Sequence, residues 1–202
     1  MLNPYHYRHA LVVAAAMLVG ASVGGAQAAK ATGKAKPAHV QGRFKVSAPD
    51  LESKGRITAA HVFNSFGCSG QNISPALNWS NAPAGTKSFA VTAYDPDAPT
   101  GSGWWHWVMY NIPATATGLV AGAGNGRNAP SGSQQGNTDF GSKGYGGPCP
   151  PAGDKPHHYH FTVFALKVDK LDVPGNATAA MVGFNLNANK LATARVTGLY
   201  AR

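Results

Sequence analysis

The sequence predicts a mostly-β domain, and three features support that class. Glycine and proline are frequent, at 25 and 14 residues in a chain of 202, as expected where many short strands are joined by turns. Segments rich in aromatic and β-branched residues, which strands favour, recur along the chain. Hydrophobic residues make up 44% of the chain and charged residues 12%, which indicates a folded core and excludes a largely disordered protein.

Four segments have the composition of core strands, and a fifth is a weaker candidate. The four are residues 89–94, 105–112, 159–168 and 191–199, and the fifth is 57–63. Thr178 can cap a helix that begins at Ala179. Residues 121–156 show no periodicity, and we expect a long functional loop there because such loops are otherwise uncommon in a compact domain.

The first 28 residues have the order of a secretory signal peptide. Arg8 precedes an apolar run from Ala10 to Val19, and small residues follow as far as Ala28. The run is short for a membrane span, so we expect cleavage near Ala28 and a periplasmic or secreted protein, with an uncleaved anchor as the alternative. Nothing later in the chain suggests stable membrane insertion.

The formal charge of +9 is concentrated near the N-terminus. Six of the 17 basic residues lie in residues 1–45, which hold no acidic residue, so 11 basic and eight acidic residues remain beyond them. We therefore expect a basic, flexible leader at 29–45 and one domain at 46–202. A Lys/Ala/Gly stretch without aromatic residues is most simply a solvated linker, and we expect no nucleic-acid partner.

Two cysteines, Cys68 and Cys149, would reach an oxidising compartment after export. A bridge between them would stabilise the fold by roughly 4 kcal/mol on the chain-entropy argument. Sequence alone leaves two reduced thiols as the alternative, because it does not show that the two Cα atoms come close.

The first polar motif is Asp95-Pro96-Asp97-Ala98-Pro99, directly after an expected strand. Its prolines fix φ and exclude helix at the residues before them, so both carboxylates are held on a rigid turn. A turn that merely ends a strand is the simpler alternative.

The second motif surrounds His106, within residues 103–111. Strand alternation predicts His106, Val108 and Tyr110 on one face. It places Trp105, Trp107 and Met109 on the other face. A carboxylate bound to one ring nitrogen would fix the tautomer of the histidine and raise its pKa, and the second nitrogen could then donate to an anion.

The third motif runs from the glycine- and proline-rich residues 144–153 into a histidine cluster at 157–160. Glycines allow backbone N–H groups to approach an anion closely. Alternation puts His157 and Tyr159 on one face of the strand and His158 and His160 on the other. Two imidazoles without a clear third ligand are weak evidence for a metal, and we expect none.

In this order the motifs resemble the phosphatidylethanolamine-binding protein family, and residues 66–79 resemble its bacterial, Raf kinase inhibitor-like branch. The resemblance implies a Greek-key antiparallel sheet with a few short helices, and a small pocket for phosphate or a phospholipid head group. The ligand-binding residues it implies are Asp95, Asp97, Pro99, Trp105, His106, Gly147, Pro148, His157 and Tyr159.

We therefore expect an exported binding protein that has no cofactor and is not an enzyme. His106, His157 and Tyr159 would donate hydrogen bonds to a phosphate-bearing ligand, and Asp95 and Asp97 would orient the imidazoles. Two alternatives stay open: an inhibitor of a protein partner such as a protease or kinase, and a phosphoester hydrolase using an Asp–His pair. The sequence does not decide between a monomer and a homodimer.

Overall fold

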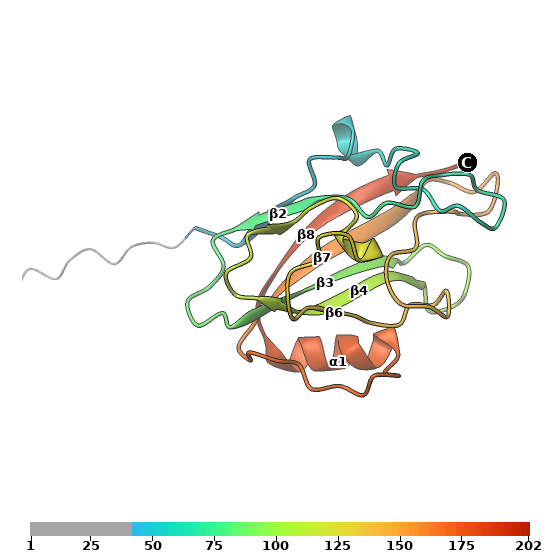
Figure 1. Cartoon of the computed structure of the whole chain (residues 1–202). Coiled ribbons are helices and arrows are strands. Elements are labelled where there is room, and N and C mark those ends of the chain that lie inside the picture. Colours follow the sequence, from blue (N-terminus) through green and yellow to red (C-terminus); the bar gives the residue numbers. More distant parts are fainter. Residues whose placement is uncertain (1–41) are drawn as a thin grey trace, which may run out of the picture. The chain divides into compact units, whose positions relative to one another are not determined.

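The computed structural model describes residues 42–202, in which two antiparallel sheets and one α-helix are arranged as Figure 1 shows. The larger sheet has the strand order β6 (Gln134–Gln135), β4 (Trp104–Pro113), β3 (Ser88–Asp95), β7 (His157–Leu166) and β8 (Lys190–Tyr200). The smaller sheet has the order β1 (Lys45–Ser47), β2 (Leu77–Ser80) and β5 (Gly118–Leu119). The predicted mostly-β, antiparallel class is confirmed.

The two faces of the larger sheet bury two hydrophobic cores. One core lies toward the smaller sheet and includes Trp107, Met109 and Phe161. The other lies under the helix α1 (Ala179–Asn189) and includes Val108 and Leu166. Central strands covered on both sides are nearly all apolar, which explains why β3 and most of β7 show no polar face in the sequence.

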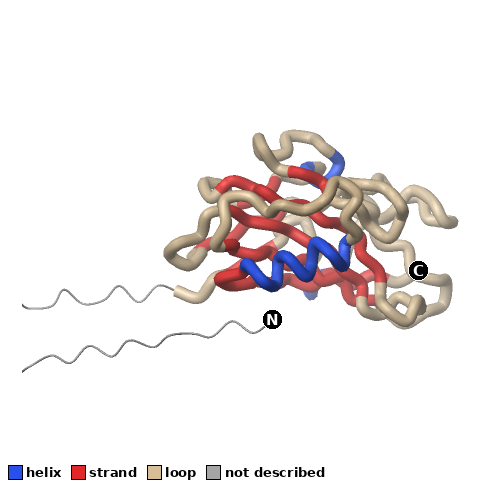
Figure 2. Tube along the Cα trace, turned by 90° about the horizontal axis from the view of Figure 1, so that it is seen from below, coloured by secondary structure: helices blue, strands red, loops and turns tan. Residues whose placement is uncertain are grey.

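The helix begins where the sequence predicts. The Thr178 side chain accepts a hydrogen bond from the Met181 backbone N–H at 3.2 Å, which satisfies a donor that the first turn leaves free. Val182 and Leu186, one turn apart, are buried against the sheet, and Figure 2 shows the helix lying across the strands. No helix among residues 42–202 is long and apolar enough to cross a bilayer.

The predicted strand at 57–63 is wrong. Only its start pairs with the sheet, where the Ile57 N–H donates to the Leu199 carbonyl at 2.9 Å. The chain then turns, with the His61 N–H bonded to the Thr58 carbonyl at 3.0 Å. Ile57 and Val62 are buried in the main core although their segment forms no strand, so their composition alone suggested one.

The folded domain begins slightly before the predicted boundary at residue 46. Phe44 is buried and its ring stacks on Phe89 at 6.2 Å, and β1 begins at Lys45. The predicted signal peptide and leader residues 29–41 lie outside the described residues. The expected long loop at 121–156 holds only the one-turn helix η2 (Ala123–Asn125) and β6.

Strand β4 contains a bulge at His106. Ala93 on β3 pairs with Trp107 and the next residue, Tyr94, pairs with Trp105, so His106 has no opposite residue on β3. A residue inserted in this way interrupts the alternation of side chains between the two faces of a sheet. The bulge therefore decides where His106 points.

Candidate functional site

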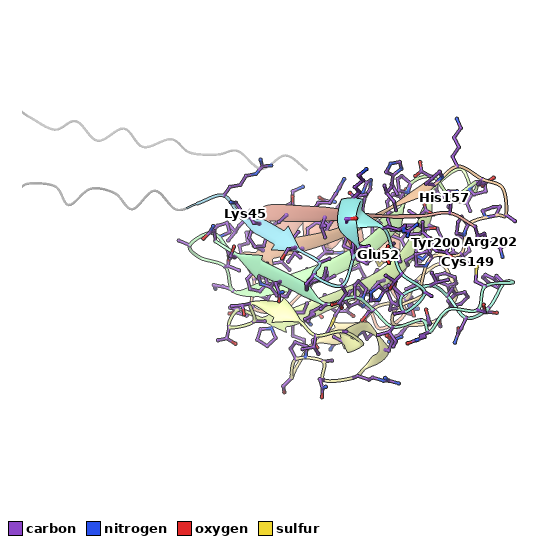
Figure 3. All side chains as sticks on the ribbon, turned by 90° about the horizontal axis from the view of Figure 1, so that it is seen from above. Lys45, Glu52, Cys149, His157, Tyr200 and Arg202 are labelled. Carbon is purple, nitrogen blue, oxygen red and sulfur yellow. A yellow bond between two sulfur atoms is a disulfide. The ribbon has the colours of Figure 1, made fainter. Side chains whose placement is uncertain are left out.

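A small pocket of about 160 Å³ lies at the end of the larger sheet where β3 stops and β4 and β7 begin. Figure 3 shows His157 and Cys149 at this end of the molecule, far from Lys45. The pocket is lined by Phe66, Asp95, Ala98, Pro99, Thr100, Trp104, His106, Phe140, Cys149, Pro150, Pro151, His157 and Tyr159. The structure thus brings together Asp95, Pro99, His106, His157 and Tyr159 from three separate sequence motifs.

His157 and Asp95 form a buried pair at the base of this pocket. The His157 Nδ1 lies 2.8 Å from the Asp95 Oδ2, and both side chains are almost fully buried. Asp95 is itself fixed, because its Oδ1 accepts a hydrogen bond from the Asp97 N–H at 2.8 Å. Burial alone lowers the pKa of His157, but the hydrogen bond and charge of Asp95 outweigh it, so the net pKa is raised. The Nε2 of His157 lies 3.4 Å from the Asp154 Oδ2, which also raises this pKa, so the two carboxylates together favour the imidazolium.

His106 is held in a different way from the one the sequence suggested. Its Nδ1 lies 2.7 Å from the Gly146 carbonyl, which can only accept, so Nδ1 carries the proton. Complete burial lowers the pKa of His106 to about 4, against the opposing effects of the Gly146 carbonyl and the Asp95 charge. The ring is therefore neutral near pH 7 and its Nε2 is a hydrogen-bond acceptor. The expectation that both imidazoles are carboxylate-bound donors is wrong for His106.

The bulge also corrects the predicted faces of β4. His106 lies with its ring 5.1 Å from that of Tyr159, on the side of the sheet that Trp107 and Met109 share. Trp105 packs instead against the core under α1, where Val108 also lies. Trp105 consequently does not line the pocket, and Trp104 takes that place.

Two donors in the pocket wall lack partners among the described residues. They are the Tyr159 hydroxyl and the Trp104 Nε1, both buried. Burial, and then the charge and hydrogen-bonding potential of nearby Asp95, raise the pKa of Tyr159, so its hydroxyl stays protonated, although it lies within hydrogen-bond distance of no described group. An unpartnered buried polar group costs free energy, and these two groups are most simply explained by a ligand or water that accepts from them.

Asp97, Gly147 and Pro148 lie beside the pocket and not on its surface. The Asp97 Oδ2 accepts from the backbone N–H and the Nδ1 of His158, at 2.7 and 2.8 Å. It therefore orients His158, a half-exposed histidine outside the pocket, and not a pocket imidazole. The Gly147 N–H donates to the Asn72 Oδ1 at 2.7 Å, and the Pro148 carbonyl accepts from the Phe63 N–H at 3.0 Å. Both residues position the wall.

Several residues that shape this site were missed in the sequence. Asn72, in the left-handed conformation at φ 53°, ties residues 145 and 147 of the glycine-rich loop through its side chain. Arg202 joins two wall segments, donating from Nε to the Pro150 carbonyl at 2.6 Å and from Nη1 to the Gly67 carbonyl at 3.0 Å. The glycine-rich residues indicated a site in the sequence. The residues far along the chain that bind this loop cannot be recognised from the local sequence.

The predicted disulfide is confirmed. Cys68 and Cys149 are bonded at 2.06 Å with their Cα atoms 6.0 Å apart, within the usual range for a bridge. Cys149 lines the pocket, and the bridge ties that wall to the segment carrying Phe66. Phe66 is 66% exposed and its ring lies 6.1 Å from that of Phe140, also in the lining. The rim of the pocket therefore carries aromatic rings and is held by the disulfide.

The described residues contain no group of three His, Cys, Asp or Glu side chains placed to hold a metal ion. Thr100 supplies the one hydroxyl of an aliphatic side chain in the lining, and it already donates to the Gly103 carbonyl. The groups that the pocket offers are hydrogen-bonding ones. They are the His157 ring between the Asp95 and Asp154 carboxylates, the neutral His106 ring, and two donors without partners among the described residues.

The chain is similar in sequence and in fold to known proteins. Residues 47–201 match the sequence pattern of the family described as "Phosphatidylethanolamine-binding protein". The Escherichia coli proteins YbcL and YbhB are 57% and 51% identical over 159 residues, which cover 78% of this chain and 87% and 100% of theirs. The crystal structure of E. coli YbcL, described as a member of the mammalian PEBP family, superposes with a TM-score of 0.76 at 56% identity over 79% of this chain and 98% of its own.

Proposed function

The chain belongs to the phosphatidylethanolamine-binding protein family, and on that premise we propose that its pocket binds the phosphate group of a small ligand or phospholipid head group without turning it over. The observation that carries the proposal is the buried His157–Asp95 pair beside the unpartnered Tyr159 hydroxyl. The other His157 nitrogen, Nε2, lies 3.4 Å from the partly exposed Asp154 carboxylate, so a bound anion would take the place of that carboxylate as the partner of Nε2.

The electrostatics favour an anion over a neutral ligand. The raised pKa of His157 favours the protonated ring over the neutral one, and a bound phosphate would raise that pKa further. Charge-assisted hydrogen bonds of this kind are the stronger ones. Asp95 compensates the imidazolium before the ligand arrives, so the empty pocket is stable.

The tautomer of His106 adds a preference within this ligand class. With its proton on Nδ1, the ring offers only the Nε2 lone pair to a ligand. It is complementary to a ligand atom that carries a hydrogen, such as the hydroxyl of a singly protonated phosphate or an ammonium N–H. The pocket is therefore suited to a monoester near its second ionisation, or to a zwitterionic head group.

The site offers little support for the hydrolase alternative. The His157–Asp95 pair could move a proton, but the Nε2 of His157 lies 3.4 Å from the Asp154 carboxylate, and the Thr100 hydroxyl donates to the Gly103 carbonyl. The exposed Phe66 ring at the rim is a specific feature that suits either an acyl chain or an apolar side chain of a protein partner.

We also propose that the protein is exported. The bridge between Cys68 and Cys149 is a feature of oxidising compartments, in agreement with the signal order of residues 8–28. N-terminal sequencing of protein recovered from the periplasm or medium should give a first residue near Ala29. A chain that starts at Met1 would contradict the proposal.

Calorimetric titration of inorganic phosphate and glycerophosphoethanolamine tests the proposed ligand class. His157→Gln replaces the imidazolium by a neutral amide of similar reach, so affinity should fall roughly ten- to a hundredfold. The affinity of the wild type should fall as the pH rises through the pKa of His157, because the imidazolium is then lost. The carboxylates that raise this pKa are those of Asp95, Asp154 and Asp97.

The matched control is His158→Gln, since His158 is half exposed and bonded to Asp97 outside the pocket. Its affinity and pH profile should equal those of the wild type. Equal loss in both variants would contradict the pocket assignment. Release of phosphate from p-nitrophenyl phosphate that disappears in His157→Gln would establish the hydrolase instead.

A further inference from the structure

The opposite face of the larger sheet carries a second hollow, of about 220 Å³, between the strands and the end of α1. We call it the outer groove and define it by Thr92, Trp105, His160, Thr162, Lys190 and Arg195. Its floor follows the strand register, because Thr92 on β3 pairs with Thr162 on β7, which pairs with Arg195 on β8. Side chains from paired residues share a face, so the three form one row across the sheet.

The groove carries two cations and no carboxylate. The cationic residues that line it are Arg195 and Lys190. Within residues 42–202 neither Arg195 nor Lys190 forms an ion pair. Uncompensated cations gathered in a concave surface attract anions, whereas an isolated surface lysine does not define a site.

Both cations are held in place by neutral partners. The Arg195 Nε donates to the Thr162 Oγ1 at 3.2 Å, which leaves its two terminal amino groups free for a ligand. The Lys190 Nζ donates to the Asn187 Oδ1 at 2.7 Å. Lys190 directly follows α1 and offsets the partial negative charge at that helix end. Arg195 is therefore the principal anion-binding group.

Two threonine hydroxyls lie in the floor. Thr92 is 3% exposed as a residue, but its hydroxyl is not among the fully buried polar atoms without a partner, so it is accessible from the groove. Thr162, which is 6% exposed, accepts from Arg195 and keeps its own proton to donate. Two hydroxyl donors and a guanidinium in one row match an acceptor with several oxygens.

We propose that the outer groove is a second anion site, which binds a phosphate- or sulfate-type oxyanion between Arg195, Lys190 and the floor hydroxyls. This site lies on the other face of the sheet from the His157 pocket and shares no lining residue with it. The proposal therefore does not depend on the function proposed above. The oxyanion is either free in solution or carried on an anionic lipid surface, and the two sources share the same contacts.

His160 provides an internal reporter of occupancy. Burial, the charge of Arg195 and that of His158 lower its pKa, while Asp97 and Asp95 act in the opposite direction. An oxyanion bound beside Arg195 should raise the pKa of His160, because it favours the imidazolium. Binding should correspondingly strengthen as pH falls.

Amide NMR with inorganic phosphate as the probe tests the proposal. Shifts at the amides of Thr162 and Thr193 report on the outer groove, and those of His157 and Tyr159 on the pocket. Arg195→Gln should weaken binding at the outer groove at least tenfold, since a charge-assisted bidentate contact is lost. Arg127→Gln, which removes the same charge from an exposed turn, should leave it unchanged, as should His157→Gln.

Vesicles of phosphatidylcholine containing one third phosphatidylglycerol form the second arm, read by sedimentation. Retention that Arg195→Gln abolishes and Arg127→Gln preserves would assign the site to a membrane-borne phosphate. Shifts with free phosphate alone would assign it to a soluble anion. If neither probe responds to Arg195→Gln, or if Arg127→Gln weakens both equally, no such site exists. A thermal melt confirms that each variant is folded.

Discussion

At the scale of single residues, the pocket contains polar groups that are costly to bury. The Tyr159 hydroxyl and the Trp104 Nε1 lack partners within the described part of the chain, and His106 is held neutral by burial. Evolution of a stable core alone would favour apolar side chains there. Their presence is consistent with a trade of stability for binding.

Tyr159→Phe should separate stability from binding. Removing an unpartnered buried hydroxyl should raise the free energy of unfolding by about 1 kcal/mol. It should weaken phosphate binding roughly tenfold, because one donor is lost. Urea denaturation and calorimetric titration measure the two effects.

Tyr145→Phe is the matched control for this change. The Tyr145 hydroxyl is also buried but donates to the His61 carbonyl at 2.9 Å. Its removal leaves that acceptor unpaired, so stability should fall by about 1–3 kcal/mol with binding unchanged. If both variants lose stability alike, Tyr159 already has a partner in solution and its role as a free donor is wrong.

His106 should make the fold sensitive to mild acid. Its pKa is lowered to about 4 in the folded state, from about 6.5 in an unfolded chain. The unfolded chain therefore takes up this proton more readily than the folded protein. The contribution of His106 to stability is complete above pH 6.5 and is lost as the pH falls from 6.5 to about 4. The loss approaches about 3 kcal/mol by linkage.

Urea midpoints of the wild type and His106→Gln at pH 7.5 and 4.5 measure this contribution. The variant should lose less stability on acidification, while His158→Gln, altered at an exposed site, should follow the wild type. Equal losses in the wild type and His106→Gln would show that folding does not lower the pKa of the His106 ring.

At the scale of elements, the strands and the helix could be predicted because their signals are local. The apolar runs of β3 and β7 and the Thr178 cap depend on adjacent residues, and each was placed within a few positions. The face of His106 could not be predicted, because the bulge arises from how β4 pairs with β3. The alternation of side chains between two faces predicts orientations only where the register does not shift. On β7, where it does not shift near the site, His157 and Tyr159 share a face as predicted.

Thr178→Ala tests the helix α1, whose first residue was predicted correctly. Loss of the cap to Met181 should destabilise the fold by about 1 kcal/mol, measured by urea denaturation. Thr115→Ala is the control, since Thr115 is exposed and outside any helix or strand. Equal effects of the two changes would mean that the cap contributes nothing beyond a surface threonine.

At the scale of the whole molecule, the pocket depends on contacts between distant segments, and here sequence is least informative. Asn72 reaches the glycine-rich loop, and Arg202 joins Gly67 to Pro150. No local pattern marks these partners, since each is one polar residue among many loop residues. The polar residues of the pocket were found through the order of the motifs and their family resemblance, whereas the contacts that hold the wall required the fold.

The disulfide should stabilise the domain and keep the pocket shaped. It closes a separation of 81 residues, for which chain entropy gives about 4 kcal/mol. Cys68→Ser with Cys149→Ser should therefore lower the urea midpoint, and reduction of the wild type should do the same. Because the bridge ties the Phe66 segment to the Cys149 wall, phosphate affinity should fall as well.

Arg202→Ala distinguishes these two roles, because it removes the bonds to Gly67 and Pro150 but keeps the bridge. If wall alignment sets affinity, this variant should weaken phosphate binding while keeping most of the stability that the double serine variant loses. If affinity instead follows the unfolding free energy across both variants, the pocket is held by global stability. An oxidised and a reduced wild type with the same urea midpoint would contradict the stabilising role of the bridge, since the entropy it removes from the unfolded chain would then have no measurable effect.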